Sequence, residues 1–326
     1  MDSELRIVEI PPEHQASSTI KGHTDSVDFV RINENASSPQ IISASHDGTV
    51  KIWDLSRKNE LSSILAHQEG VFCCDVSPNG RQIASCSPDQ TVALWDISNR
   101  NNIARATNHT HKVYFVLFIS DSQLLSCGRD RNIFLWDLRN MRAPSKNFAT
   151  PQSGTFRSVA LSPDNSILLA TTAESGIEAY EFPSGRPIAN QTINYDMRVF
   201  PQEKEFLVPP AIIYNARFFR NQRNTFLSSH QDHAVRKFEL NNGNLTQISY
   251  HRNHWDYVRH VEISSNERFY VSTAQDGSVR VWDAASNTPQ LSLIGHTQIV
   301  SSAAIARDNR TIVTSSYDQT LKIFTI

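Results

Sequence analysis

The 326-residue sequence predicts an all-β fold, a ring of seven similar sheets, and two observations indicate it. Residues 41–55, IISASHDGTVKIWDL, alternate apolar and polar positions on both sides of Asp47 and Gly48, which suits two antiparallel strands joined by a tight turn. The pattern recurs along the chain, with an aromatic residue six positions after each acidic turn residue. The aromatic residues are Trp53, Trp95, Trp136, Tyr180, Phe238, Trp282 and Phe324.

The spacing of these aromatic residues supports the same fold. The intervals are 42, 41, 44, 58, 44 and 42 positions. A period of about forty residues with four short strands per unit is typical of the blades of a β-propeller. The longest interval lies between Tyr180 and Phe238 and predicts an insertion within residues 183–210. Insertions in repeat folds emerge as loops. This one is therefore either a loop that binds a partner or a surface loop without a binding role.

A His followed four positions later by Val precedes most of the aromatic residues. It occurs in five units, at His23, His67, His109, His254 and His296. The units of Tyr180 and Phe238 have Gln152 and Pro210 in its place. The unit of Tyr180 also has Glu174 as its turn acid, so it is the most divergent of the seven.

Two dipeptides then give a family resemblance. Gly22-His23 and Gly295-His296 open two units, and the second dipeptide stands at Trp53-Asp54, Trp95-Asp96, Trp136-Asp137 and Trp282-Asp283. The chain therefore resembles the WD-repeat (WD40) family, whose units begin with Gly-His and end with Trp-Asp. The resemblance covers nearly the whole chain. It implies a single domain over residues 1–326, a seven-bladed WD-repeat β-propeller.

We expect the N-terminal strand to close the ring by pairing with the C-terminal blade. Ile326 follows the third strand of the last unit directly, and an unpaired sheet edge favours aggregation. Residues 1–20 are therefore predicted to hold the closing strand, within residues 16–20, as the outer strand of the blade built from residues 295–326.

The resemblance also implies a hydrogen-bonded network of His, Ser or Thr, Asp and Trp in each blade. The hydroxyl residues are Ser43, Ser85, Ser126, Ser228, Ser272 and Thr314. On this basis Asp47 and Asp276 are structural acids, because buried polar groups need partners. We expect the network to be complete in the four blades with Trp, shortened in the two with Phe, and absent in the blade of Tyr180, which should be the least stable.

Composition and motifs indicate a binding protein. The 31 Lys and Arg and 33 Asp and Glu residues leave a net charge of −2, so no overall field attracts nucleic acid or an anionic membrane. No leader or apolar stretch of membrane-spanning length occurs, which predicts a cytoplasmic or nuclear location and no membrane insertion. Phosphate-binding, nucleophile-elbow and HExxH motifs do not occur either. We therefore expect no enzymatic activity, no cofactor and no metal.

The resemblance places the residues three and five positions after each His, and the residue before each turn acid, around the mouth of a central channel. Counting from Pro210 in the unit that lacks His selects Ile213 and Asn215. Nine of the residues in this region are aromatic or basic and form the predicted partner site. They are Phe72, Lys112, Tyr114, Arg129, Arg157, Trp255, Tyr257, Arg259 and Tyr317.

Aromatic and Arg residues dominate binding hot spots, and Arg beside aromatic rings suits an acidic or phosphorylated peptide. The alternative is that the nine are unrelated surface residues. The predicted function is a non-enzymatic scaffold or adaptor subunit of a multiprotein complex. A second hypothesis rests on Asp137 and Arg139, which resemble the box by which WD-repeat substrate receptors engage cullin-RING ubiquitin ligases.

Overall fold

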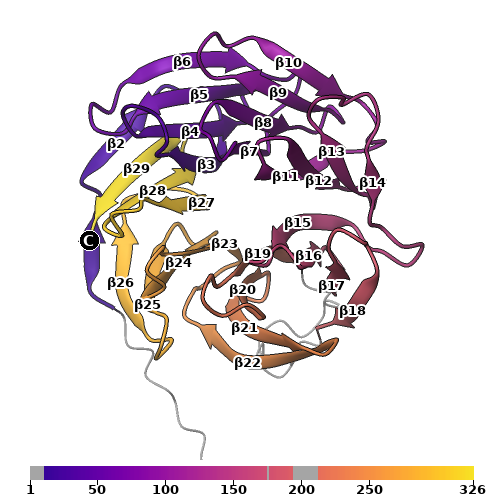
Figure 1. Cartoon of the computed structure of the whole chain (residues 1–326). Helices are drawn as coiled ribbons and strands as arrows, with labels where there is room; N and C mark the ends of the chain where they lie inside the picture. Colours follow the sequence, from indigo (N-terminus) through magenta and orange to yellow (C-terminus); the bar gives the residue numbers. More distant parts are fainter. Residues whose placement is uncertain (1–10, 175, 194–211) are drawn as a thin grey trace, which may run out of the picture.

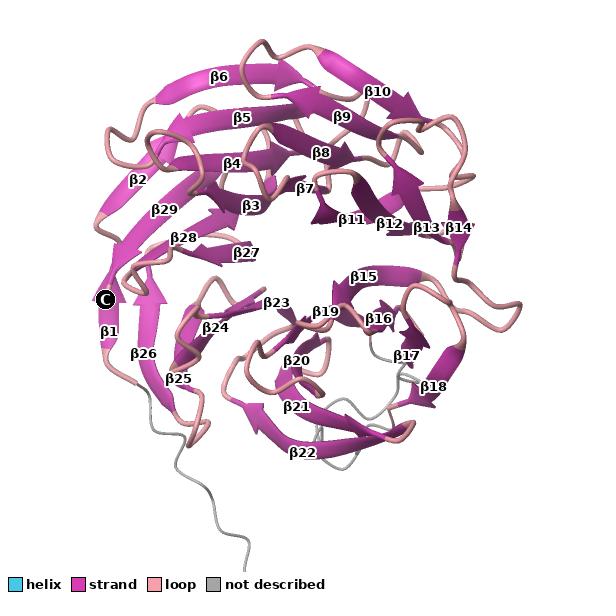
Figure 2. Cartoon of the chain, in the orientation of Figure 1, coloured by secondary structure: helices cyan, strands magenta, loops and turns pink. Residues whose placement is uncertain are grey.

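The computed structural model describes residues 11–174, 176–193 and 212–326, and every regular element in these ranges is a β-strand. The strands form seven sheets arranged in a ring (Figure 1). Coloured by secondary structure, the described chain contains only strands and loops (Figure 2). The predicted all-β, seven-bladed β-propeller is thus confirmed.

Blades 1 to 4 are antiparallel sheets of four consecutive strands, with the first strand of each nearest the centre of the ring (Figure 1). Blade 1 contains β3 (Val27–Asn33), β4 (Gln40–Ser45), β5 (Thr49–Asp54) and β6 (Glu60–Leu65). Blade 2 contains β7 (Cys73–Val76), β8 (Gln82–Cys86), β9 (Val92–Asp96) and β10 (Asn102–Ala106). Blade 3 contains β11 (Val113–Ser120), β12 (Gln123–Gly128), β13 (Ile133–Asp137) and β14 (Lys146–Asn147). Blade 4 contains β15 (Phe156–Leu161), β16 (Ile167–Thr172), β17 (Gly176–Glu181) and β18 (Pro187–Thr192).

The last three blades follow the same plan. Blade 5 contains β19 (Ile213–Phe218), β20 (Thr225–His230), β21 (Ala234–Asn241) and β22 (Asn244–Arg252). Blade 6 contains β23 (Val258–Ile263), β24 (Phe269–Ala274), β25 (Val279–Asp283) and β26 (Pro289–Ile294). Blade 7 contains β27 (Val300–Ile305), β28 (Thr311–Ser316) and β29 (Thr320–Thr325) from the C-terminal part. The insertion was predicted within residues 183–210; the first part of this range contains β18 of blade 4, and residues 194–210 fall outside the described residues.

The N-terminal part of the chain closes the ring, as predicted. β2 (Ser18–Lys21) pairs antiparallel with β29 as the fourth strand of blade 7. Ile20, opposite Leu321, is buried in an apolar cluster that also contains Ile323. The strand lies slightly later in the chain than the predicted segment of residues 16–20.

A second N-terminal strand was not predicted. β1 (Glu13–Gln15) runs parallel to β26 and adds a fifth strand to blade 6. His14 Nε2 also lies 2.9 Å from the carbonyl oxygen of Thr325. Residues 13–21 therefore attach to the outer edges of both blade 6 and blade 7, so the closure is broader than one strand.

The predicted hydrogen-bonded network of His, Ser, Asp and Trp is present in the blades that have Trp. In blade 1, Trp53 Nε1 donates to Ser43 Oγ at 2.8 Å, Ser43 Oγ lies 2.7 Å from His23 Nε2, and His23 Nδ1 lies 2.8 Å from Asp47 Oδ2. Every polar atom along this path has a partner, because the hydroxyl accepts from the indole and donates to the imidazole. Blades 2, 3 and 6 repeat the path, and blade 7 repeats it without an indole.

Blade 4 differs from the prediction, because its network is replaced rather than absent. Ser153 Oγ donates to Glu178 Oε2 at 2.8 Å, and the hydroxyl of Tyr180 donates to the same oxygen. Glu178 is buried, and its other oxygen accepts the Gly154 backbone N–H. A buried carboxylate on β17 therefore takes the place of the missing imidazole. In blade 5, where no upstream His is present, His230 Nε2 lies 2.7 Å from Ser228 Oγ.

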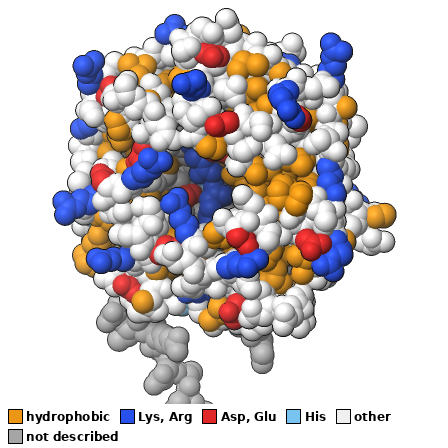
Figure 3. All heavy atoms as spheres, viewed as in Figure 1, with side chains coloured by type: hydrophobic (Ala, Val, Ile, Leu, Met, Phe, Trp, Pro, Cys, Tyr) orange, Lys and Arg blue, Asp and Glu red, His pale blue; other side chains and the backbone are white. Residues whose placement is uncertain are grey.

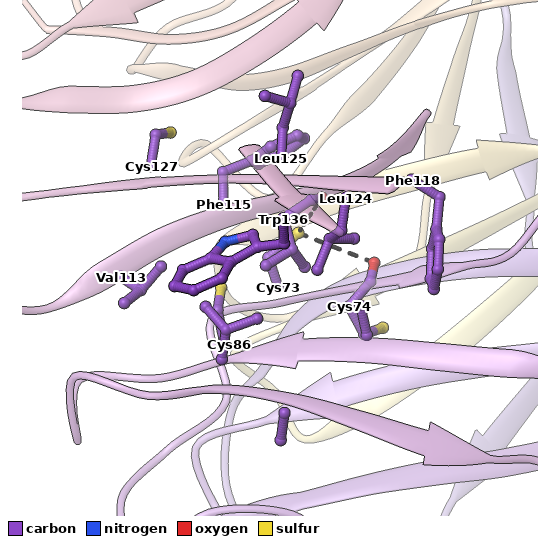
Figure 4. Close-up of a cluster of buried hydrophobic side chains, with 14 of the residues drawn as sticks. Cys73, Cys74, Cys86, Val113, Phe115, Phe118, Leu124, Leu125, Cys127 and Trp136 are labelled. Atoms are coloured by element: carbon purple, nitrogen blue, oxygen red, sulfur yellow. Dashed lines mark hydrogen bonds between the residues drawn. The ribbon is translucent and has the colours of Figure 1, made fainter. Parts of the chain in front are cut away.

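Apolar packing between adjacent blades forms the core. The four cysteines, which are Cys73, Cys74, Cys86 and Cys127, are buried and free, and Figure 4 shows them near Trp136. Burial raises the pKa of the Cys74, Cys86 and Cys127 thiols, which keeps them protonated. They act as small apolar side chains in this core.

Candidate functional site

The inner strands share an irregularity that shapes one end of the central channel. Six of the seven carry a β-bulge close to their first residue, at Asp28, Tyr114, Arg157, Tyr214, Arg259 and Ser301. A bulge leaves one residue outside the regular pairing and changes the direction of its side chain. These side chains line a pocket at the channel mouth.

Seven side chains, one from each blade, form a closed circle at this mouth, which we name the mouth ring. In order around the circle they are Tyr317, His46, Phe72, Tyr114, Arg157, Tyr214 and Arg259. Blades 1 and 7 have small bulge residues, Asp28 and Ser301, and contribute instead the residue that precedes the turn acid. Each member contacts the next, so the ring is a preformed surface.

The basic half of the ring contains two guanidinium groups on tyrosine rings. Arg157 lies 4.3 Å from the ring centroid of Tyr114 and 5.4 Å from that of Tyr214. Arg259 lies 4.6 Å from the same Tyr214 centroid, and its Nη2 donates to Tyr317 Oη at 3.3 Å. In the described chain neither arginine has a carboxylate within 4.0 Å. Their charge is therefore available to a ligand.

The aromatic half of the ring is built by ring contacts. Phe72 stacks on Tyr114 with centroids 5.6 Å apart. His46 contacts Phe72 and Tyr317 edge to face, at 5.6 and 6.0 Å. Such pairs stabilise one another by about 0.5–1.5 kcal/mol beyond their buried area. The mouth therefore presents a rigid aromatic wall beside the two arginines.

The mouth ring surrounds a pocket of about 380 Å³. Phe29, Phe115, Asn215 and His260 line it below the ring. Viewed along the ring axis, the molecule has a central hollow with Lys and Arg side chains inside it (Figure 3). The pocket is large enough to hold a side chain of a partner.

Asp28 is the acidic group of the pocket. Its Oδ2 lies 3.3 Å from His46 Nε2 but has no hydrogen-bond partner. Burial, offset only in part by the charges of His46 and Arg259, raises the pKa of Asp28 to about 6. The carboxyl therefore lies within the influence of His46, Arg259 and Tyr317 at one side of the pocket.

Paired charges separate this pocket from the other end of the channel. Arg31 lies 3.1 Å from Asp75 and 3.4 Å from Glu262, and Arg217 lies 3.1 Å from Glu262. A second cavity, of about 540 Å³, lies beyond them and is lined by the ends of the inner strands. Because these charges balance one another, they form a neutral polar layer, unlike the mouth.

The structure brings five of the nine predicted site residues together and separates the other four. The five in the mouth ring are Phe72, Tyr114, Arg157, Arg259 and Tyr317. The four that do not line the pocket are Lys112, Arg129, Trp255 and Tyr257. Trp255 is 73% exposed, and Tyr257 contacts the ring of His233 at 5.8 Å. These four lie on the surface around the ring.

Sequence reasoning missed Tyr214 and His46. Tyr214 was missed because counting began at Pro210, whereas Ile213 occupies the place that Val27 and Val113 occupy in blades 1 and 3. Aligning the unit on Ile213 instead of on the missing His would have selected Tyr214. His46 was in the right position but was not counted as aromatic.

The second predicted site lies far from the mouth ring in the fold, after β13. Arg139 is 83% exposed, and its side chain forms a bidentate ion pair with Asp137. Asp137 Oδ1 also accepts the backbone N–H of Arg139, so the pair stabilises the turn that follows β13 within blade 3. The role of these two residues in a ubiquitin ligase stays a prediction.

No cluster of three or more His, Cys, Asp or Glu among the described residues could hold a metal ion. In the same part of the chain, no helix is long and apolar enough to cross a membrane.

Comparison with known families agrees with the blade pattern. The model of the family "WD domain, G-beta repeat" matches residues 15–54, 58–96, 101–137, 245–283 and 287–325. The chain belongs to the WD-repeat family. These matches leave out blade 4 and most of blade 5, which are the two blades without the upstream His. The WD-repeat pattern is thus weakest where the His-based network is replaced.

The WD-repeat chain is similar to parts of several characterised proteins. It is 42% identical over 62 residues to zebrafish (Danio rerio) apoptotic protease-activating factor 1, which is 19% of this chain and 5% of that protein. It is 31% identical over 102 residues to the Saccharomyces cerevisiae target of rapamycin complex subunit LST8, 31% of this chain and 33% of the relative. It is 36% identical over 62 residues to the Neurospora crassa small ribosomal subunit protein RACK1, 19% and 20% of the two chains. The matched regions therefore span a third or less of these relatives.

Proposed function

We propose that this WD-repeat propeller is a non-enzymatic adaptor subunit that binds partner proteins at its mouth ring, through acidic or phosphorylated segments. The relatives support the class of function, because LST8 is named as a subunit of a complex and RACK1 as a protein of the small ribosomal subunit. The observation that carries the proposal is the ring itself. It holds two arginines without a carboxylate partner in the described chain, beside a rigid aromatic wall.

The physical basis is the burial of preorganised groups. Aromatic and Arg side chains that are already fixed lose little conformational entropy when a partner binds, so they contribute most to affinity. Arg157 is held between two tyrosine rings, and Arg259 by Tyr214 and Tyr317. A guanidinium in this setting forms a stronger hydrogen bond to an anion than a mobile surface lysine does.

The test is affinity purification of the tagged chain from its own cells. The double variant Arg157→Ala/Arg259→Ala is compared with wild type and with Arg81→Ala/Arg100→Ala, a control that removes two exposed arginines of blade 2. We expect the first variant to lose specific partners and the control to retain them. The proposal is wrong if both variants retain every partner while the thermal unfolding of both is normal.

A further inference from the structure

The pocket below the mouth ring contains polar atoms that the protein itself does not satisfy. Asn215 is 2% exposed, yet its Nδ2 and Oδ1 both have no hydrogen-bond partner, and Asp28 Oδ2 has none either. Both residues line the pocket. Buried polar groups in native proteins are nearly always paired, so unpaired ones need an explanation.

The chemistry of the walls excludes a cationic ligand. An aromatic cage binds a cation on the faces of its rings. Here Arg157 already lies over Tyr114 and Tyr214, and Arg259 over Tyr214. A third positive charge would be repelled by both guanidinium groups.

The same walls favour an anion. Burial lowers the pKa of Arg157, and the neighbouring charge of Arg259 lowers it further. An oxyanion placed beside them would offset both unfavourable effects. Asn215 lines the same pocket as Arg157 and Arg259, and its amide N–H group can donate to an anion bound there.

We propose that this pocket binds one oxyanion, a carboxylate or phosphoryl group on a partner's side chain, which enters through the mouth ring and is held by Arg157, Arg259 and Asn215. The inference rests on the proposed function, because it assigns the group that the adaptor recognises. Asp28 Oδ2 and Asn215 Oδ1 accept hydrogen bonds, so they suit an N–H of the peptide that carries the anion. One acidic residue, rather than a run of charge, is the unit recognised.

The experiment uses the full chain and four pools of fluorescent eleven-residue peptides. Each pool is random except for its central residue, which is Glu, phosphoserine, Gln or Lys. We expect fluorescence anisotropy to show binding of the Glu or the phosphoserine pool at least about tenfold tighter than of the Gln and Lys pools. The ratio of Glu to phosphoserine affinity then identifies the source of the oxyanion. Equal affinity for all four pools would overturn the inference.

Two asparagines provide a matched pair of variants. Asn215 and Asn33 are both 2% exposed, but Asn33 Nδ2 donates to Gln40 Oε1 at 3.2 Å and to the Gly80 carbonyl at 3.1 Å. Removing an unpaired polar group costs the free protein little, whereas removing a paired one leaves its partners unsatisfied. Asn215→Ala should therefore keep the melting temperature and lose about tenfold in affinity for the preferred pool. Asn33→Ala should lower the melting temperature and leave the affinity for the preferred pool unchanged.

The outcomes separate the two proposals. If Asn215→Ala lowers the melting temperature and leaves affinity unchanged, the amide is structural and the inference is wrong. The adaptor proposal then survives if Arg157→Ala/Arg259→Ala still loses its partners. If that double variant keeps its partners and binds every pool as wild type does, both proposals fail. The wild-type comparison of the Glu and phosphoserine pools with the Gln and Lys pools needs no variant, so it decides the inference even where a variant does not fold.

Discussion

The indole nitrogen of Trp53 donates a 2.8 Å hydrogen bond to Ser43 Oγ, and this hydroxyl lies 2.7 Å from His23 Nε2. Ser43→Ala removes the shared partner of two buried groups. The free energy of unfolding should fall by about 1–3 kcal/mol, measured by urea denaturation. Ser63, exposed on β6 of the same blade, gives the control. Equal effects of Ser43→Ala and Ser63→Ala would mean that the network contributes nothing.

The sequence predicted this network well because it lies within one blade. The spacing from Ser43 to Trp53 is fixed by two short strands and a tight turn, so any unit with that spacing places the hydroxyl near the indole. Contacts between blades follow no such spacing. The mouth ring depends on which bulge residue faces which neighbour, and only the assembled ring decides that.

Three features were not predicted from the sequence, each for a different reason. The alignment that began at Pro210 was one residue late, so it selected Asn215 in place of Tyr214, the residue at the bulge of β19. Glu178 lies two positions before Tyr180, where the other units have no acidic residue, and only the fold places it beside Ser153 and Tyr180. β1 is three residues long, too short for a hydrophobic pattern.

The N-terminal closure is tested by graded deletion. Removing residues 1–21 deletes both β1 and β2, including the buried Ile20, and exposes the edge of β29. The loss of one buried Ile and of the strand pairing should cost about 4 kcal/mol, a drop of about 10 °C in melting temperature. Removing residues 1–17 keeps β2 and should cost much less. If the two deletions melt alike, β2 is not the closing element.

The replacement network of blade 4 is tested at Glu178. Glu178→Ala leaves the hydroxyls of Ser153 and Tyr180 without their acceptor, which should destabilise by about 1–3 kcal/mol. Hydrogen exchange should become faster in the amides of β15 to β17 in particular. The control is Glu174→Ala, which removes the exposed residue that the sequence pattern indicated as the turn acid. If Glu174→Ala is the more destabilising change, Glu174 is the turn acid that stabilises blade 4, as the sequence pattern indicated. Whether blade 4 is the least stable blade stays a prediction that the same exchange data would decide.

The last prediction concerns the buried carboxyl of the mouth pocket. Burial raises the pKa of Asp28 from 3.8 to about 6, so the folded protein binds this proton more tightly than the unfolded chain does. The protonated carboxyl of Asp28 therefore adds to the free energy of unfolding below about pH 4, and this contribution is lost as the pH rises to 6. Above pH 6 the ionised group costs about 3 kcal/mol. Asp28→Asn should raise the melting temperature at pH 7.5, and the gain should disappear near pH 4.

The pKa of Asp47 shifts in the opposite direction to that of Asp28. Burial disfavours its charge, but hydrogen bonds from His23 and Thr49 outweigh this and lower the pKa of Asp47. Its stabilisation is present above pH 3.8 and is lost only in stronger acid. Asp47→Asn should therefore lower the melting temperature at pH 7.5, where Asp28→Asn raises it. Since neutralising Asp28 also removes a negative charge from the lining of the pocket, it should tighten binding of the Glu pool at neutral pH. A gain in stability that is independent of pH would show that the pKa of Asp28 is the same in the folded protein as in the unfolded chain.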